Sequence, residues 1–190
     1  LEEMLSNKLS DYEANRRDSE PLQARSVVHI SPLSDEKLVT LSAKEVLEIL
    51  KKYNGPEEDI LSDAPSKSGL LQGIERQIKA RPLEFCAEIT AFQKLNTDDF
   101  ADLMHDFRMA EFEVTDDFRG NYVKLAKAFV ESHYPEAEER SKRNFSQSVT
   151  NIFRRIYNSS ENHLSMGDDA FVVLDTIISD KSVGSAMLSS

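Results

Sequence analysis

The feature that most limits the fold of this chain is a series of short amphipathic segments separated by very little punctuation. Between Ser68 and Phe107, apolar residues recur at helical spacing in three successive runs, separated only by Arg81-Pro82 and by Asn96-Thr97. Residues four positions apart fall on one side of an α-helix, so each run predicts a helix with one apolar face. A proline cannot continue a helix but suits the first turn of the next one. The stretch therefore predicts three consecutive helices.

Flanking residues predict where other helices begin and end. Ser42 and Glu45 match a capping box, in which each side chain binds the backbone N–H of the other residue. The helix that follows should end at Asn54-Gly55-Pro56, because the first two residues tolerate a left-handed conformation and the proline cannot extend the helix. Thr97-Asp98-Asp99 and Thr115-Asp116-Asp117 carry the hydroxyl and carboxylate groups typical of helix N-termini. From Ser42 onward we expect about seven helices of roughly 12 to 18 residues, joined by short loops.

The apolar residues of these helices form the predicted core. A short helix with one apolar face is marginal alone, so the helices must bury these faces against one another. The residues expected to point inward are Leu70, Leu71, Ile74, Ile78, Phe85, Ile89, Phe92, Leu95, Phe100, Leu103, Met104, Phe107, Phe118, Tyr122, Leu125, Phe129, Val130, Phe145, Val149, Ile152, Phe153, Ile156, Phe171, Leu174, Ile177 and Ile178.

The N-terminal part and one loop follow other patterns. Residues 1–16 predict a polar helix whose narrow apolar stripe should pack on a neighbouring element; the stripe consists of Leu1, Leu5, Leu9 and Tyr12. Residues 17–33 contain an extended candidate, Ser26–Ile30, interpreted as a connector because no second strand is predicted to pair with it. A helical turn should open at Ser34, and residues 56–67 predict an acidic surface loop with a turn at Glu57–Leu61.

These observations predict an all-α protein. We expect an N-terminal helix and connector at residues 1–33 and a helical-repeat domain at residues 34–190. An irregular, HEAT-like α-solenoid of stacked antiparallel helix hairpins fits best, because stacking buries one face of each helix and no residue-level repeat is visible. A compact helical bundle is the alternative. Because Leu1 is not a methionine and already has a helical pattern, we interpret the chain as a piece of a larger protein.

Charge and cysteine content exclude several classes of function. The net charge of −11 repels phosphate backbones, so a nucleic-acid partner is not expected unless a local basic patch supplies it. The single cysteine, Cys86, excludes an internal disulfide and a cysteine-based zinc site, and it favours a reducing compartment. No apolar run reaches the roughly 18 residues of a membrane span, and no basic-then-apolar leader opens the chain. We expect a cytoplasmic protein without a membrane segment.

Motifs for nucleotide binding and nucleophilic catalysis are missing from the sequence. Gly69 and Gly73 are too close together for a Walker A loop, and Ile74 follows where that loop needs a lysine. No serine stands in a Gly-x-Ser-x-Gly elbow. Cys86 lies beside the apolar stripe at the start of a predicted helix, which favours a half-buried structural thiol over a nucleophile. We therefore expect no cofactor, no small-molecule substrate and no catalytic residue in this segment.

One acidic group could in principle hold a divalent cation. Asp98, Asp99, Asp102, His105 and Asp106 lie within about three turns of one predicted helix. We prefer to interpret them as a solvated acidic face, because carboxylates near a helix N-terminus are favoured by the helix dipole. No metal site is expected, and an enzyme built on this group is the least favoured hypothesis.

The strongest candidate for binding is basic. Arg140, Arg143, Arg154 and Arg155 flank one predicted helix and could line a single ridge. Such a ridge could contact a phosphate, an acidic partner or the acidic helices of a neighbouring repeat. The alternative is ordinary surface charge, paired locally with the glutamates at 136–139. We take the four arginines as candidate partner-binding residues.

The order of the elements resembles a known family. The segments ISPLSDEKLVTLSAKEVLEILKKYNGPEE, SGLLQGIERQIKARPLEFCAEITAF, DDFADLMHDFRMAE and NIFRRIYNSSENHLSMGDDAFVVLDTIISD are similar to successive helices of the helical-repeat region of very large bacterial STAND-like NTPases associated with phage defence. The resemblance covers about residues 30 to 180, and it departs from the pattern at Asp106, where a glycine is usual. It implies a scaffold or sensor module beside a separate ATPase domain, and it carries no catalytic residue onto this segment.

Together these observations favour one function over two others. We expect a non-catalytic helical scaffold or protein-interaction segment of a larger bacterial protein, whose partner is another protein or adjacent repeats of the same chain. A stand-alone adaptor or regulator that binds a protein or peptide is the alternative. Polar capping helices at both ends would favour the adaptor, because an isolated array must cover its terminal faces.

Overall fold

The computed structural model describes residues 29–57, 64–111, 113–159, 166–180 and 183, and this part of the protein is all-α, as predicted. It contains nine α-helices and one 3-10 turn, and within the same residues the only β interaction is an isolated parallel bridge between Ile30 and Pro65. The helix predicted for residues 1–16, the first part of the extended candidate and the turn predicted after Glu57 lie outside the described residues.

Helices α2 (Asp35–Thr40) and α3 (Ala43–Lys52) begin at serine caps. Ser42 and Glu45 form the predicted capping box, with the Ser42 N–H donating to Glu45 Oε2 at 2.9 Å. The end of α3 differs from the prediction, because neither Asn54 nor Gly55 adopts a left-handed conformation. Instead Tyr53 is extended, and its hydroxyl donates to the carbonyl of Pro65 (3.0 Å), which turns the chain away from the helix.

Helix α4 (Lys67–Ala80) starts where the N-terminal connector crosses it. The Ser66 hydroxyl caps the helix by accepting the Gly69 N–H (3.1 Å), and the Ser66 N–H donates to the carbonyl of Ile30 (2.9 Å). A Cβ on Gly69 would lie 2.2 Å from the Ile30 carbonyl oxygen. This crossing therefore requires a residue without a side chain.

The helix predicted to follow Pro82 is divided into α5 (Pro82–Ala87) and α6 (Ile89–Phe92), so the prediction of one helix is wrong here. Pro82 begins α5 as expected, but the chain leaves the helical conformation at Glu88 (φ −86°, ψ 46°). The β-branched pair Ile89-Thr90 follows the break, and such residues have reduced helix propensity.

Helices α7 (Thr97–Met109) and α8 (Asp116–Ser132) form the middle of the protein. Thr115 caps α8 as predicted, but the cap of α7 is Asn96 and not Thr97. Asn96 Oδ1 accepts the N–H of Asp99 at 2.8 Å.

A 3-10 turn (Tyr134–Glu136) leads into α9 (Glu139–Ser159), and α10 (Gly167–Ser179) follows. Helix α10 buries Ala170, Val173 and Ile177. Phe171 and Ile178, which the sequence pattern placed in the core, are each 70% exposed, so the prediction is wrong at both. Its apolar arc is wider than the area that one neighbouring helix covers.

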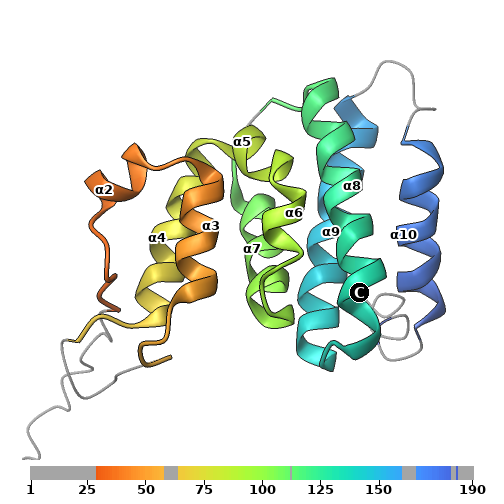
Figure 1. The fold of residues 1–190 in the computed structure, drawn as a ribbon. Helices are drawn as coiled ribbons and strands as arrows, with labels where there is room; N and C mark the ends of the chain where they lie inside the picture. Colours follow the sequence, from red (N-terminus) through yellow and green to blue (C-terminus); the bar gives the residue numbers. More distant parts are fainter. Residues whose placement is uncertain (1–28, 58–63, 112, 160–165, 181–182, 184–190) are drawn as a thin grey trace, which may run out of the picture.

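The helices stand in two rows (Figure 1). One row contains α3, α6, α8 and α10, in which each helix contacts the next, and α5 packs above it against α8. The other row contains α4, α7 and α9, again with contacts between neighbours. Helix α4 packs against α3, whereas ring contacts join α6 to α7 and α8 to α9. Within the described residues, α10 ends the first row and has no helix behind it.

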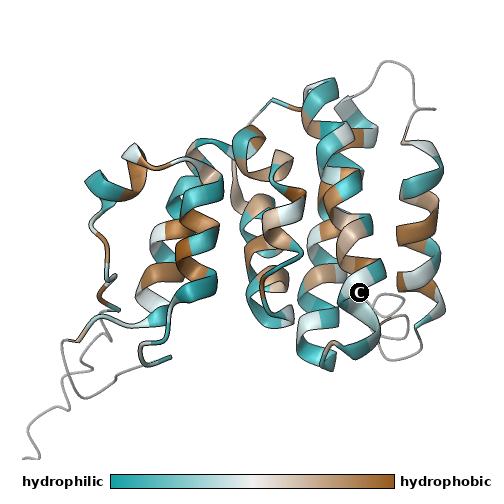
Figure 2. Ribbon diagram, in the orientation of Figure 1, coloured by the Kyte–Doolittle hydropathy of each residue, from teal (hydrophilic) through white to brown (hydrophobic). Residues whose placement is uncertain are grey.

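The core lies between the two rows and consists of the buried apolar residues of the helices. Figure 2 shows apolar and polar residues alternating along each helix. A chain of aromatic rings crosses it, with centroids 5.1 Å apart for Phe92–Phe100, 5.0 Å for Phe100–Phe129 and 4.3 Å for Phe129–Phe145. Each of these rings is fully buried, which stabilises the fold by roughly 1.5–3 kcal/mol per side chain. The core is thus continuous from α2 to α10.

Candidate functional site

The acidic residues of α7 do not converge on a common point. Asp99 is buried and lies 3.0 Å from the amino group of Lys67, while Asn96 donates to its other oxygen at 2.7 Å. Burial raises the pKa of Asp99, and Lys67 offsets part of this effect. Asp98 accepts from the Ser141 hydroxyl at 2.5 Å. These carboxylates therefore serve contacts with two different helices, α4 and α9.

Metal binding finds no support in the described part of the chain, where no group of three or more His, Cys, Asp or Glu side chains could hold an ion. A small cavity of about 140 Å³ does lie between α7 and α9, lined by Asp98, Asp102, Glu138, Arg140 and Ser141. The guanidinium of Arg140 supplies positive charge at this cavity, so a cation is not needed there.

His105 and Asp106 form part of the contact between α7 and its neighbours. Arg108 donates to His105 Nε2 (3.3 Å), so the ring proton is on Nδ1, which faces the Ser148 hydroxyl of α9 (3.4 Å). Burial and then Arg108 lower the pKa of His105. Burial, and then the nearby Glu75, raise the pKa of Asp106 to about 8. Both side chains are thus held in environments that disfavour their charged forms.

Cys86 is a structural thiol, as the sequence indicated, although it is fully rather than half buried. It donates to the Leu83 carbonyl (3.4 Å), and burial raises the pKa of the thiol to about 12. A thiol with this pKa is not a nucleophile near neutral pH.

The structure separates the four candidate arginines into different environments. Arg155 is half-buried and donates to the Ala110 carbonyl at the end of α7 (3.1 Å), so it closes that helix. Arg140, Arg143 and Arg154 are exposed on α9. Arg140 borders the cavity beside α7, and Arg154 donates to Asn151 of its own helix. Binding by these residues stays a prediction.

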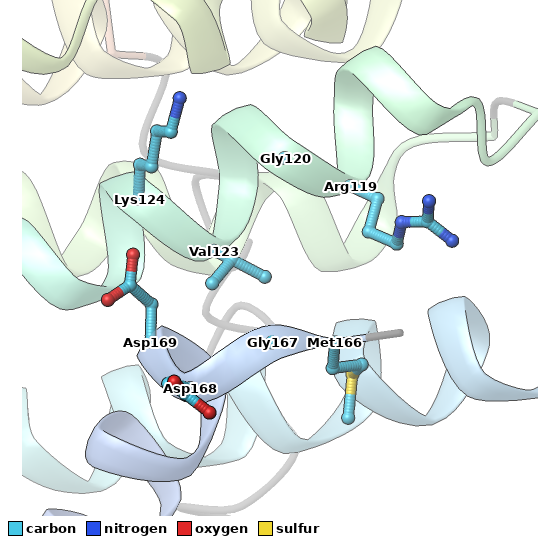
Figure 3. A pocket seen from close by; sticks show the side chains of 8 residues that line it. All are labelled: Arg119, Gly120, Val123, Lys124, Met166, Gly167, Asp168 and Asp169. Atoms are coloured by element: carbon cyan, nitrogen blue, oxygen red, sulfur yellow. The ribbon is translucent and has the colours of Figure 1, made fainter. Parts of the chain in front are cut away.

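A larger hollow of about 380 Å³ lies between α8 and α10. Figure 3 shows its lining, in which Arg119 and Lys124 extend in different directions from α8, and Asp168 and Asp169 come from α10. Gly120 leaves space on one side, because nothing lies within 4 Å of the position of its missing Cβ. The polar groups have mixed charge and do not converge, which is unlike a small-molecule site.

The apolar surface of α10 could not be assigned to particular residues from the sequence. Two ion pairs fix α10: Lys127 of α8 binds Asp169 (2.7 Å), and Lys142 of α9 binds Asp180 just after α10 (3.1 Å). Phe171 and Ile178 remain uncovered on this fixed helix. The only sequence signal for them was the width of the apolar arc of α10.

Comparisons of the chain with protein-family models, with curated proteins and with solved structures found no match. Among the described residues, no helix has the length and apolar character needed to cross a membrane. The candidate functional surface therefore rests on the structure alone. It consists of the exposed arginines of α9 and the exposed apolar side chains of α10.

Proposed function

We propose that this chain is a non-catalytic helical scaffold segment of a larger bacterial protein, and that α10 provides a protein-interaction surface. The observation that carries the proposal is the 70% exposure of Phe171 and Ile178 on α10, which ends the first row among helices α2 to α10. Contiguous exposed apolar side chains on a helix mark contact with further polypeptide. The polar groups around the larger hollow do not converge, which fits a segment without catalysis.

The solenoid arrangement belongs to the same proposal. Front and back helices alternate along the chain, as in α3 with α4, α6 with α7 and α8 with α9. A further helix behind α10 would extend this pattern, which is how stacked helical repeats bury their faces. The resemblance to the repeat region of STAND-like NTPases supports a cytoplasmic parent protein with an ATPase domain elsewhere. A stand-alone adaptor is the alternative, and it would bind a protein or peptide through the same exposed side of α10.

Site-specific photo-crosslinking in cells tests this proposal. A benzoylphenylalanine in place of Phe171 keeps an aromatic ring on the exposed side of α10, and the same group in place of Lys44, exposed on α3, provides the control. We expect a polypeptide adduct at position 171 that is absent at position 44, and mass spectrometry should assign it to a helical segment. Equal labelling at both positions, or none at 171, would count against the scaffold. Hydrolysis of ATP by the purified segment would do so independently.

A further inference from the structure

The uncovered side of α9 carries positive charge. Ser141, Ser148 and Arg155 face α7, since each contacts a residue of α7 or the carbonyl just after it. A step of two residues along an α-helix turns the direction of the side chain by about 200° around the helix axis. Arg143 and Thr150 follow Ser141 and Ser148 by two positions, so they lie on the opposite flank of α9, and both are exposed.

The uncovered side of α10 is apolar and faces the same row. Helices α8 and α10 run in the same direction (Figure 1). On α8, Tyr122 and Phe129, seven residues apart, contact Phe153 and Phe145 of α9 behind it. On α10, Phe171 and Ile178 have the same spacing. They follow the buried Ala170 and Ile177 by one residue each, or about 100°. Helix α10 is right-handed and runs in the same direction as α8. A step of about 100° from the side that faces α8 therefore points toward the row that contains α9.

These two flanks border one position, behind α10 and beside α9, that none of the helices α2 to α10 occupies. We define the terminal surface as Arg143 and Arg154 of α9 with Phe171, Leu174 and Ile178 of α10. Arg154 follows Arg143 by eleven residues, or about 20° around the axis after three turns, so both lie on the same exposed side of α9. Arg143 has no ion pair within the described residues, and Arg154 has only its contact with Asn151 there. A helix placed at this position would meet apolar side chains on one side and arginines on the other.

Contacts within the second row indicate what such a helix carries. Where α7 meets α9, carboxylates of α7 accept hydrogen bonds from α9. Asp98 accepts one from Ser141, and Asp102 accepts one from Asn144. Where α4 meets α7, Lys67 binds the carboxylate of Asp99. Neighbours in this row therefore pair carboxylates with hydrogen-bond donors. On the uncovered flank of α9 the donors are Arg143 and Arg154, so the complementary residues are Asp or Glu.

We infer that the terminal surface binds an amphipathic α-helix of a partner segment whose apolar face is flanked by acidic residues. This rests on the proposed function and specifies its partner. Charge complementarity with Arg143 and Arg154 selects this occupant. A second copy using the same surface is disfavoured, because two-fold pairing would bring the same arginines together.

Fluorescence anisotropy with two synthetic helical peptides tests the inference on the full chain. The peptides share a leucine face, and one carries Glu and the other Lys along the flank. We expect the Glu peptide to bind at least about tenfold more tightly at low salt, with a smaller ratio at high salt. The double variant Arg143→Glu/Arg154→Glu should reverse the preference, whereas Lys44→Glu/Lys51→Glu, which makes the same change of charge on the exposed side of α3, should leave it unchanged.

The remaining outcomes separate this inference from the proposed function. If both peptides bind equally and Phe171→Ser/Ile178→Ser abolishes both, a helix docks as proposed but the acidic flank is wrong. Binding that appears only after Leu5→Asp/Leu9→Asp would identify residues 1–16 as the occupant and overturn the partner. Self-association lost in Phe171→Ser/Ile178→Ser would identify a second copy and overturn it as well. If neither peptide binds in any variant, the inference fails, while the crosslinking experiment still tests the scaffold.

Discussion

Replacing Ile177 and Ile178 with alanine, one at a time, distinguishes the side of α10 that packs on α8 from its uncovered side. The two residues are adjacent and chemically identical, but Ile177 is 1% exposed and Ile178 is 70% exposed. Both variants share the gain in helix propensity from isoleucine to alanine, which is about a few tenths of a kcal/mol. They differ only in the packing that is lost.

The expected magnitudes follow from that difference. Ile177→Ala removes three buried carbons and leaves a cavity, which costs roughly 2–5 kcal/mol in protein cores. We expect the lower end of this range, because α10 has its main contacts with a single helix, α8, so fewer side chains surround Ile177 than a residue in the middle of the core. Ile178→Ala removes a side chain that is largely solvated, so its effect on the free energy of unfolding should stay within about 0.5 kcal/mol. A difference of about 2 kcal/mol corresponds to roughly 4–8 °C in Tm for a domain of this size.

Urea unfolding followed by circular dichroism measures this difference, and hydrogen exchange of residues 167–179 detects loosening confined to α10. Wild-type protein and both variants should be compared at the same concentration. Equal losses for the two variants, or a larger loss for Ile178→Ala, would refute the assigned orientation of α10. In that case Ile178 would be covered in the protein as purified, and the terminal surface would not be free.

Other substitutions and reagents test the packing elsewhere. Gly120→Ala should raise the free energy of unfolding by about 0.8–1 kcal/mol, because its position in α8 is open. Gly69→Ala should lower the free energy of unfolding, since the new methyl group meets the Ile30 carbonyl oxygen at 2.2 Å. Urea unfolding followed by circular dichroism measures the effect of both glycine substitutions. Asp106→Asn should reduce the change with pH of the free energy of unfolding, which urea unfolding at a series of pH values measures. The pKa of Asp106 is raised to about 8, so the folded wild type keeps a proton that the unfolded chain loses near pH 4, and its stability falls as pH rises between these values. Cys86 should react with a maleimide at about pH 7 only in urea, because burial raises the pKa of the thiol to about 12.

Helix boundaries set by one strong local interaction were predictable from the sequence. Ser42 with Glu45, Pro82 and Thr115 act within a single turn, so their effect is the same in any fold. The choice between Asn96 and Thr97 as a cap was different, because both residue types cap helices. In the structure Asn96 is the cap, because its side chain accepts the N–H of Asp99. The side chain of Asp99 binds Lys67 of α4, and that contact depends on tertiary structure.

The candidate surface was only partly predictable for a related reason. Arg140, Arg143, Arg154 and Arg155 were grouped by their position along one helix, but neighbouring helices decide which flank each one occupies. The structure directs Arg155 toward α7. In α10, the sequence gives the width of the apolar arc but not the part of it that α8 covers. The apolar half of the terminal surface therefore became visible only with the packing of α10.

The ion pairs at the two ends of α10 have a consequence for the kinetics of association. Lys127–Asp169 and Lys142–Asp180 hold the helix against α8 and α9 before any ligand arrives. A partner then meets side chains whose backbone is already in place, so little conformational entropy is lost on the side of this protein. The rate of complex formation should then depend on diffusion and on attraction to the arginines of α9, and not on a prior rearrangement of α10.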